Sequence, residues 1–152
     1  MKLYLVQHAK PKKEEEDPER HLSEKGIADV KKVAVFVAES IEIKTIVHSE
    51  KTRAKQTAEI LGDYLRAPEI KGAEDLKPLA DPSVWALRLK EIDEDLMIVG
   101  HLPHLSKLCS ILVGEDEDKK VVNFQMGGVV CLERDETGSW CINWIVIPEL
   151  MS

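Results

Sequence analysis

Short apolar runs that are each followed by a helical pattern constrain the fold of this chain most strongly. Leu3–Val6 is a compact run of large side chains, which is typical of a strand buried on both faces. Similar runs recur, and apolar residues at helical spacing follow them. The predicted strands are residues 3–6, 45–48 and 95–100, and the predicted helices are residues 24–40, 52–65, 83–92 and 103–112. Strands that alternate with helices predict an α/β fold with a largely parallel sheet.

The C-terminal part of the chain has a different pattern. Residues 129–133 and 141–147 read as strands joined by a turn that contains Gly138, which predicts an antiparallel hairpin at one edge of the sheet. Trp140 and Trp144 are expected to pack on the face of that hairpin. Residues 69–81 hold a possible short strand and a loop. The whole chain is therefore interpreted as a three-layer α/β/α sandwich, with one domain spanning residues 1–152.

Composition excludes several classes of protein. The 152 residues carry a formal net charge of −7, which argues against nucleic-acid binding. No apolar stretch approaches the ~18 residues that a membrane span needs, and the N-terminus lacks the order of a signal peptide. Cys109, Cys131 and Cys141 form an odd set without CxxC spacing, so we interpret them as reduced core residues of a cytoplasmic protein.

Three chemistry-bearing residues occupy equivalent positions. His8 and His101 each follow the end of a predicted strand, and Arg53 lies in the first turn of the helix after another. Because parallel strands direct their carboxyl ends to one edge, these side chains are expected to meet there. Taken singly, each histidine also fits a surface residue with a structural hydrogen bond, and the arginine also fits an exposed or glutamate-paired residue.

Two imidazoles and a guanidinium beside helix N-termini suit a tetrahedral dianion. A neutral imidazole can attack phosphorus, while Arg53 and, if it is protonated, the second histidine stabilise the charge on the equatorial oxygens. No glycine-rich nucleotide loop and no aspartate cluster for magnesium is visible, so the pattern predicts phosphoryl transfer without a cofactor or metal. The HxxH pair of His101 and His104 is a weak indication of metal binding.

Four segments carry a resemblance to a known family. They are Tyr4–Ala9, Arg20–Gly26, Ser49–Ala58 and Val99–Pro103. The chain resembles the histidine phosphatase superfamily, whose fold is that of phosphoglycerate mutase, and most closely its short SixA-type phosphohistidine phosphatases. The resemblance implies that His8 is the phosphorylated nucleophile and that Arg53 and His101 hold the phosphate. It also places Arg20 near the pocket mouth and adds Gln7 and Leu102 to the phosphate-binding set.

The chain departs from the family pattern at two places. The family motif Arg-His-Gly reads Gln7-His8-Ala9 here, so an amide replaces a guanidinium fork. Larger members carry a general-acid glutamate in the loop that here contains Pro78, and Asp81 is a possible substitute. A sugar phosphate needs such a proton, whereas a phosphohistidine leaves as an imidazole that is protonated far more easily.

These observations support one leading hypothesis and two alternatives. The leading hypothesis is a hydrolase that removes phosphate from a histidine of a partner protein. The first alternative, motivated by Gln7, is a catalytically weak or inactive module that binds phosphate or phosphoprotein. The second, a small-molecule phosphomonoesterase, is disfavoured by Pro78 and by the short chain.

Overall fold

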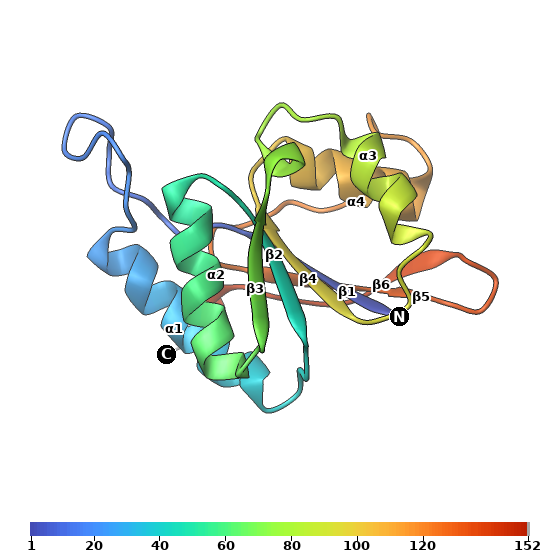
Figure 1. Ribbon diagram of the computed structural model, residues 1–152, viewed down its shortest axis with the longest axis horizontal. Helices are drawn as coiled ribbons and strands as arrows, with labels where there is room; N and C mark the ends of the chain where they lie inside the picture. The colour runs from blue at the N-terminus through green and yellow to red at the C-terminus, as the bar shows by residue number, and fades with distance from the viewer. Residues whose placement is uncertain (152) are drawn as a thin grey trace.

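A single six-stranded sheet organises the computed structural model, which describes residues 1–151 (Figure 1). The strands are β1 (Lys2–Gln7), β2 (Thr45–Ser49), β3 (Glu69–Ala73), β4 (Leu96–Gly100), β5 (Val129–Arg134) and β6 (Trp140–Val146). Their order is β3-β2-β4-β1-β5-β6, in which the first four strands are parallel, β5 is antiparallel to β1, and β6 is antiparallel to β5. The predicted mixed sheet with an edge hairpin is confirmed.

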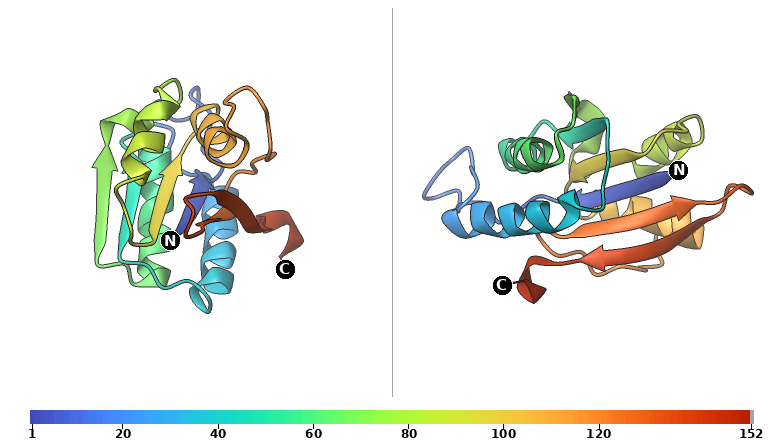
Figure 2. Two further views of the ribbon diagram at one scale, coloured as in Figure 1. Left: turned by 90° about the vertical axis from the view of Figure 1, so that its right-hand side faces the viewer. Right: turned by 90° about the horizontal axis from the view of Figure 1, so that it is seen from below.

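Helices cover both faces of the sheet. They are α1 (Glu24–Ala38), α2 (Thr52–Leu65), α3 (Pro82–Leu89) and α4 (His104–Gly114), with 3-10 turns η1 (Glu74–Leu76) and η2 (Pro148–Leu150). Figures 1 and 2 show α1 and α2 on one side of the strands and α3 and α4 on the other. The predicted three-layer arrangement is therefore confirmed.

The position of β1 between two helical layers explains why its apolar run is uninterrupted. Tyr4 and Val6 belong to the core cluster on the α1–α2 face, whereas Leu3 and Leu5 belong to the cluster on the α3–α4 face. Alternate side chains of a strand point to opposite faces, so a central strand in a three-layer fold needs apolar residues at successive positions. No helix within residues 1–151 has both the length and the apolar character to cross a membrane.

A β-bulge in β6 overturns the expectation that Trp140 and Trp144 pack on one face. Leu132 pairs with Ile142 but Cys131 pairs with Trp144, so Asn143 is an extra residue in β6. The extra residue reverses which side chains face each layer. Trp140 packs on the α3–α4 face, and Trp144 packs on the α1–α2 face.

The cysteine prediction is correct at two of three positions. Cys109 and Cys131 are buried, but Cys141 is exposed because it lies on the outward side of the edge strand β6. Element ends also differ slightly from expectation. Helix α3 ends at Leu89 rather than at residue 92, and Pro103 is the N-cap of α4 rather than its first residue.

The register of the parallel strands positions the functional edge. Gln7 at the end of β1 pairs with Gly100 at the end of β4, and His48 of β2 pairs with Val99 of β4. The chain therefore leaves these three neighbouring strands at nearly the same height. Residues that follow β1 and β4 emerge side by side, next to the start of α2.

Candidate active site

His8 follows β1 directly, and hydrogen bonds with main-chain carbonyls hold it in place. Its amide donates to the carbonyl of Gly100 at 3.0 Å, and its side chain is only 8% exposed. The ring Nδ1 lies 2.8 Å from the carbonyl oxygen of Ala9. Because a carbonyl only accepts, Nδ1 carries the proton, and the lone pair of Nε2 is free.

The environment of His8 keeps its ring neutral. Burial lowers the pKa of His8 from 6.5 to about 4, with smaller contributions from the charges of Arg53 and Arg20, while the bond to Ala9 opposes the shift. At neutral pH the ring is therefore an unprotonated imidazole. That is the form that can act as a nucleophile.

His101 lies against His8 at the end of β4. The two ring centroids are 5.0 Å apart and the planes are inclined by 58°. His101 Nε2 lies 2.8 Å from the hydroxyl oxygen of Ser49, which accepts a 3.4 Å bond from the amide of Lys51. Within residues 1–151 the hydroxyl hydrogen of Ser49 has no other acceptor, so we infer that it is donated to Nε2 and that the ring proton of His101 is on Nδ1.

The proton on His101 Nδ1 points to no protein acceptor. That atom is buried and lacks a hydrogen-bond partner. Burial, together with His8 and Arg53, lowers the pKa of His101 to about 3. His101 is therefore neutral at neutral pH, where it can serve as a neutral hydrogen-bond donor.

Arg53 in the first turn of α2 presents a second unsatisfied donor. Its Nε is buried without a partner, and burial together with the charge of Arg20 lowers its pKa. Buried donors are normally paired, because an unpaired one costs ~1–3 kcal/mol. Two such donors beside the free Nε2 of His8 fit a ligand rich in acceptor oxygens and negative charge.

Other residues in the first turns of α2 form hydrogen bonds that connect the segments of the site. The amide of Ala9 donates to Thr57 Oγ1 at 3.0 Å, and the Thr57 hydroxyl donates to the carbonyl of Arg53 at 2.8 Å. Gln56 Oε1 accepts from the amide of Leu22 at 2.7 Å. One helix thus fixes the backbone of Arg53, the end of β1 and the loop that carries Arg20.

Three of these residues were missed by sequence reasoning as functional residues. Ser49, Gln56 and Thr57 lie inside the segment Ser49–Ala58 that carries the family resemblance, but they were given no role. The available signal was a polar residue at a position expected to be buried: Ser49 ends the strand β2, Thr57 lies among the buried residues of α2, and both are 0% exposed. Buried hydroxyls of this kind require partners, and here the partners belong to the site.

The remaining predicted site residues lie at the same edge. Arg20 is close enough to lower the pKa of both His8 and Arg53. Gln7 is the last residue of β1; its carbonyl accepts from the amide of Gly127 at 2.9 Å, and its side chain makes no hydrogen bond within residues 1–151. Leu102 is 37% exposed in the turn between β4 and α4.

Asp81 does not suit the role of a substitute acid. It is the N-cap of α3 and accepts from the amide and hydroxyl of Ser83 at 2.9 and 2.8 Å. These bonds lower its pKa, so Asp81 is ionised at neutral pH and has no proton to donate. Within the described part of the chain no three potential metal ligands cluster, around His101 and His104 or elsewhere.

Comparison with known proteins assigns the family. The model of the histidine phosphatase superfamily (branch 1) matches residues 3–80, which include His8, Arg20 and Arg53. The chain belongs to the histidine phosphatase superfamily. No curated protein gives a significant match to the sequence.

Solved structures of histidine phosphatases share the fold of this chain. The protein histidine phosphatase SixA complexed with tungstate is 23% identical, with a TM-score of 0.86 over 99% of both chains. A provisionally assigned SixA from Agrobacterium tumefaciens is 22% identical, with a TM-score of 0.79 over 97% of both chains. The α-ribazole phosphatase of Shigella flexneri is 14% identical, with a TM-score of 0.77 over 97% of this chain and 96% of its own. The phosphoglycerate-mutase-like architecture is thus confirmed.

Proposed function

We propose that this member of the superfamily is a phosphatase that removes phosphate from histidine on a partner protein, through a phosphohistidine formed on His8. One observation carries the proposal. The neutral ring of His8, with a free Nε2, lies 5.0 Å from the ring of His101; Arg53 is close enough to lower the pKa of both histidines, and its Nε and the Nδ1 of His101 are buried without partners. A phosphoryl group held by these two donors would lie against Nε2 of His8.

The reaction proceeds in two displacements. In the first, the lone pair of His8 Nε2 forms a bond to phosphorus, the P–N bond of the substrate breaks, and the leaving imidazole takes a proton from water. In the second, water attacks phosphorus and gives a proton to the hydroxide left by the first step, the bond to His8 breaks with its electron pair returning to Nε2, and inorganic phosphate leaves. Arg53, Arg20 and the N–H of His101 stabilise the charge on the equatorial oxygens in both steps.

The leaving group favours a phosphohistidine substrate. The loop that carries the acid in larger family members contains Pro78 here, and Asp81 is held as a carboxylate by Ser83. An alkoxide leaving group would need a proton from such an acid, whereas an imidazole would not. A phosphohistidine protein should therefore be turned over much faster than an alkyl phosphate such as glycerol phosphate; equal rates would contradict this substrate class.

The decisive experiment traps the intermediate. The protein is mixed with a ³²P-phosphohistidine phosphotransfer protein, and phosphate release and acid-labile label on the enzyme are followed. Wild type should release phosphate and carry label transiently, whereas His8→Ala should do neither. His104→Leu, a change at a fully buried histidine outside the proposed machinery, should behave as wild type. Turnover by His8→Ala would refute the assignment of His8 as the nucleophile.

Gln7 motivates the second candidate, a module that binds phosphate but turns it over poorly. The Gln7 side chain supplies an amide where the family motif has a guanidinium. Binding of tungstate without any phosphate release would favour this alternative.

Restoring the guanidinium tests whether its loss limits the rate. A hydrogen bond to a charged group contributes ~1.5–3 kcal/mol, so Gln7→Arg should raise turnover by roughly 10- to 100-fold. The measurement is kcat on a phosphohistidine protein, with Gln125→Arg on a nearby loop as the matched control. An unchanged kcat would show that residue 7 does not limit the reaction.

A further inference from the structure

The loop between β1 and α1 carries Arg20 on an ordered excursion. Its two ends are tied together, because the amide of Lys12 donates to the carbonyl of His21 at 2.8 Å and Pro11 bridges to Leu22. Between these ties the chain extends beyond the sheet, as the blue loop of Figure 1 shows. Any conformation that this loop adopts sets the position of Arg20 relative to the pocket.

The backbone of Arg20 is in an unusual conformation. Its φ is 52°, in the left-handed region that residues other than glycine seldom adopt. A neighbouring group must therefore hold the chain in this conformation. For residues 19 to 21, that group is Asp17.

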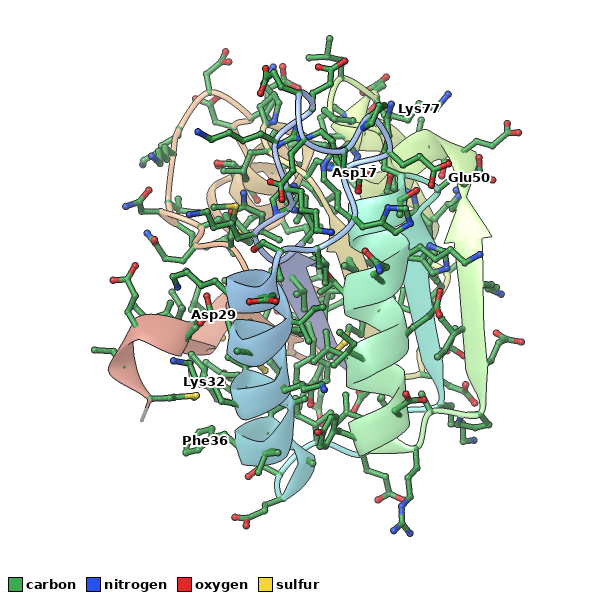
Figure 3. The ribbon with its side chains drawn as sticks, turned by 90° about the vertical axis from the view of Figure 1, so that its left-hand side faces the viewer. Asp17, Asp29, Lys32, Phe36, Glu50 and Lys77 are labelled. Atoms are coloured by element: carbon green, nitrogen blue, oxygen red, sulfur yellow. The ribbon has the colours of Figure 1, made fainter. Side chains whose placement is uncertain are left out.

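Asp17 bonds to all three of these residues. Its carbonyl accepts from the amide of Arg20 at 2.9 Å, and its Oδ1 accepts from the amide of Glu19 at 3.1 Å. Its Oδ2 accepts from the amide of His21 at 2.9 Å and from the His21 ring Nδ1 at 2.8 Å. One carboxylate thus fixes the residues on both sides of Arg20. Figure 3 shows Asp17 at the end of the molecule toward which β3 points.

The guanidinium held in this way faces a repulsive environment. Arg20 Nε donates to the carbonyl of Lys12 at 3.1 Å, and no terminal nitrogen of Arg20 has a hydrogen-bond partner in residues 1–151. Its charge lies near Arg53 and lowers the pKa of that residue. Two neighbouring cations repel each other, so a free Arg20 would turn toward solvent when no anion is bound.

We propose that Asp17 is a positioning residue of the phosphate site: its carboxylate holds residues 19–21 in the turn that directs the Arg20 guanidinium toward Arg53 and His8. This inference rests on the proposed phosphate site and extends it by a residue that does not touch the anion. Asp17 acts through Arg20 and preorganises the pocket before the anion arrives.

A double-mutant cycle on anion affinity tests the proposal. The Kd for tungstate is measured by calorimetry for wild type, Asp17→Asn, Arg20→Ala and the double variant. Arg20→Ala should weaken binding by roughly 10- to 100-fold, because it removes a charged hydrogen-bond donor. Asp17→Asn should weaken binding by about 3-fold or more but not beyond the Arg20→Ala loss, and it should have no effect in the Arg20→Ala background.

Two controls separate positioning from general damage. Glu19→Gln changes an exposed neighbour whose side chain holds no backbone group, and it should bind tungstate as wild type does. His21→Gln removes the ring contacts with Asp17 and Glu19 but keeps the bond from the His21 amide to Asp17, so it should give a smaller loss than Asp17→Asn. In addition, the pKa of His8, followed by NMR of its ring protons, should rise both in Arg20→Ala and in Asp17→Asn.

The outcomes are distinct from those of the proposed function. Wild-type affinity in Asp17→Asn, or an equal loss with and without Arg20, would overturn the positioning role and leave the phosphatase proposal intact. Absence of tungstate binding by wild type would overturn both. Tungstate binding with the expected cycle but no turnover would support the positioning role and overturn only the catalytic proposal.

Discussion

At the scale of single residues, the site depends on which nitrogen of each imidazole carries its proton. A main-chain carbonyl sets the tautomer of His8, and the bond with the Ser49 hydroxyl is inferred to leave the proton of His101 on Nδ1. Both side chains are then complementary, since one offers a lone pair and the other offers a donor. Such control by a neighbouring group is what orients imidazoles in catalytic sites.

Ser49→Ala should impair catalysis without unfolding the protein. The variant loses the hydroxyl that fixes the His101 ring, so kcat should fall by roughly 5-fold, in line with a hydrogen bond of ~1 kcal/mol. Steady-state kinetics on a phosphohistidine protein measure the effect. Ser110→Ala is the matched control, because its buried hydroxyl donates to Ser106 within α4, away from the site. Equal effects of the two substitutions would argue against the tautomer assignment.

At the scale of elements, α1 is joined to the loop from β1 by a close backbone approach. Ser23 caps α1 by accepting from the amide of Gly26, and it also bonds to the carbonyl of Lys10. A Cβ at residue 26 would lie 2.2 Å from that carbonyl oxygen. Only glycine permits this approach, because a main-chain atom cannot move aside alone.

Gly26→Ala should therefore destabilise the protein, although alanine is the better helix former. We expect a loss of about 1–3 kcal/mol in the free energy of unfolding, measured by urea denaturation, together with weaker tungstate binding. Gly114→Ala in α4 meets only ordinary van der Waals contacts and should be neutral or stabilising by ~0.5–1 kcal/mol. Similar changes at both positions would contradict the role of the close approach.

The limits of prediction from sequence also become clear at this scale. Apolar runs and helical spacing were enough to place β1, β2, β4 and the four helices, because these elements bury continuous apolar faces. The same logic placed His8 and His101 at one edge. The bulge at Asn143 was not predictable, since a single extra residue leaves no mark in an apolar pattern. Nor were the partners of Ser49 and Asp17, which depend on segments brought together only by folding.

At the scale of the whole molecule, burying neutral histidines makes stability depend on pH. The pKa of His8 is about 4 in the folded protein and 6.5 as the ordinary value. Below pH 6.5 the unfolded chain binds a proton that the folded chain rejects, so stability is complete above pH 6.5 and falls as the pH approaches 4. For His8 alone, the difference between these two pKa values corresponds to about 3 kcal/mol of folding stability.

Urea denaturation at pH 7.5, 6 and 5 should therefore show a steady decrease in the free energy of unfolding. His8→Asn should reduce the slope, because it removes one of the groups that are forced to stay neutral. A flat dependence between pH 7.5 and 5 would mean that the imidazole is far more hydrated than its 8% exposure indicates.

The start of α2 has a thermodynamic consequence. Arg53, Gln56 and Thr57 occupy a little more than one helical turn, and each holds a different part of the pocket. The helix cannot release one of these attachments while keeping the others, so the pocket opens as a unit. An anion that occupies it should accordingly slow hydrogen exchange at Ala9, at Leu22 and along this turn by a common factor, and that shared protection would extend well beyond the atoms that the anion contacts.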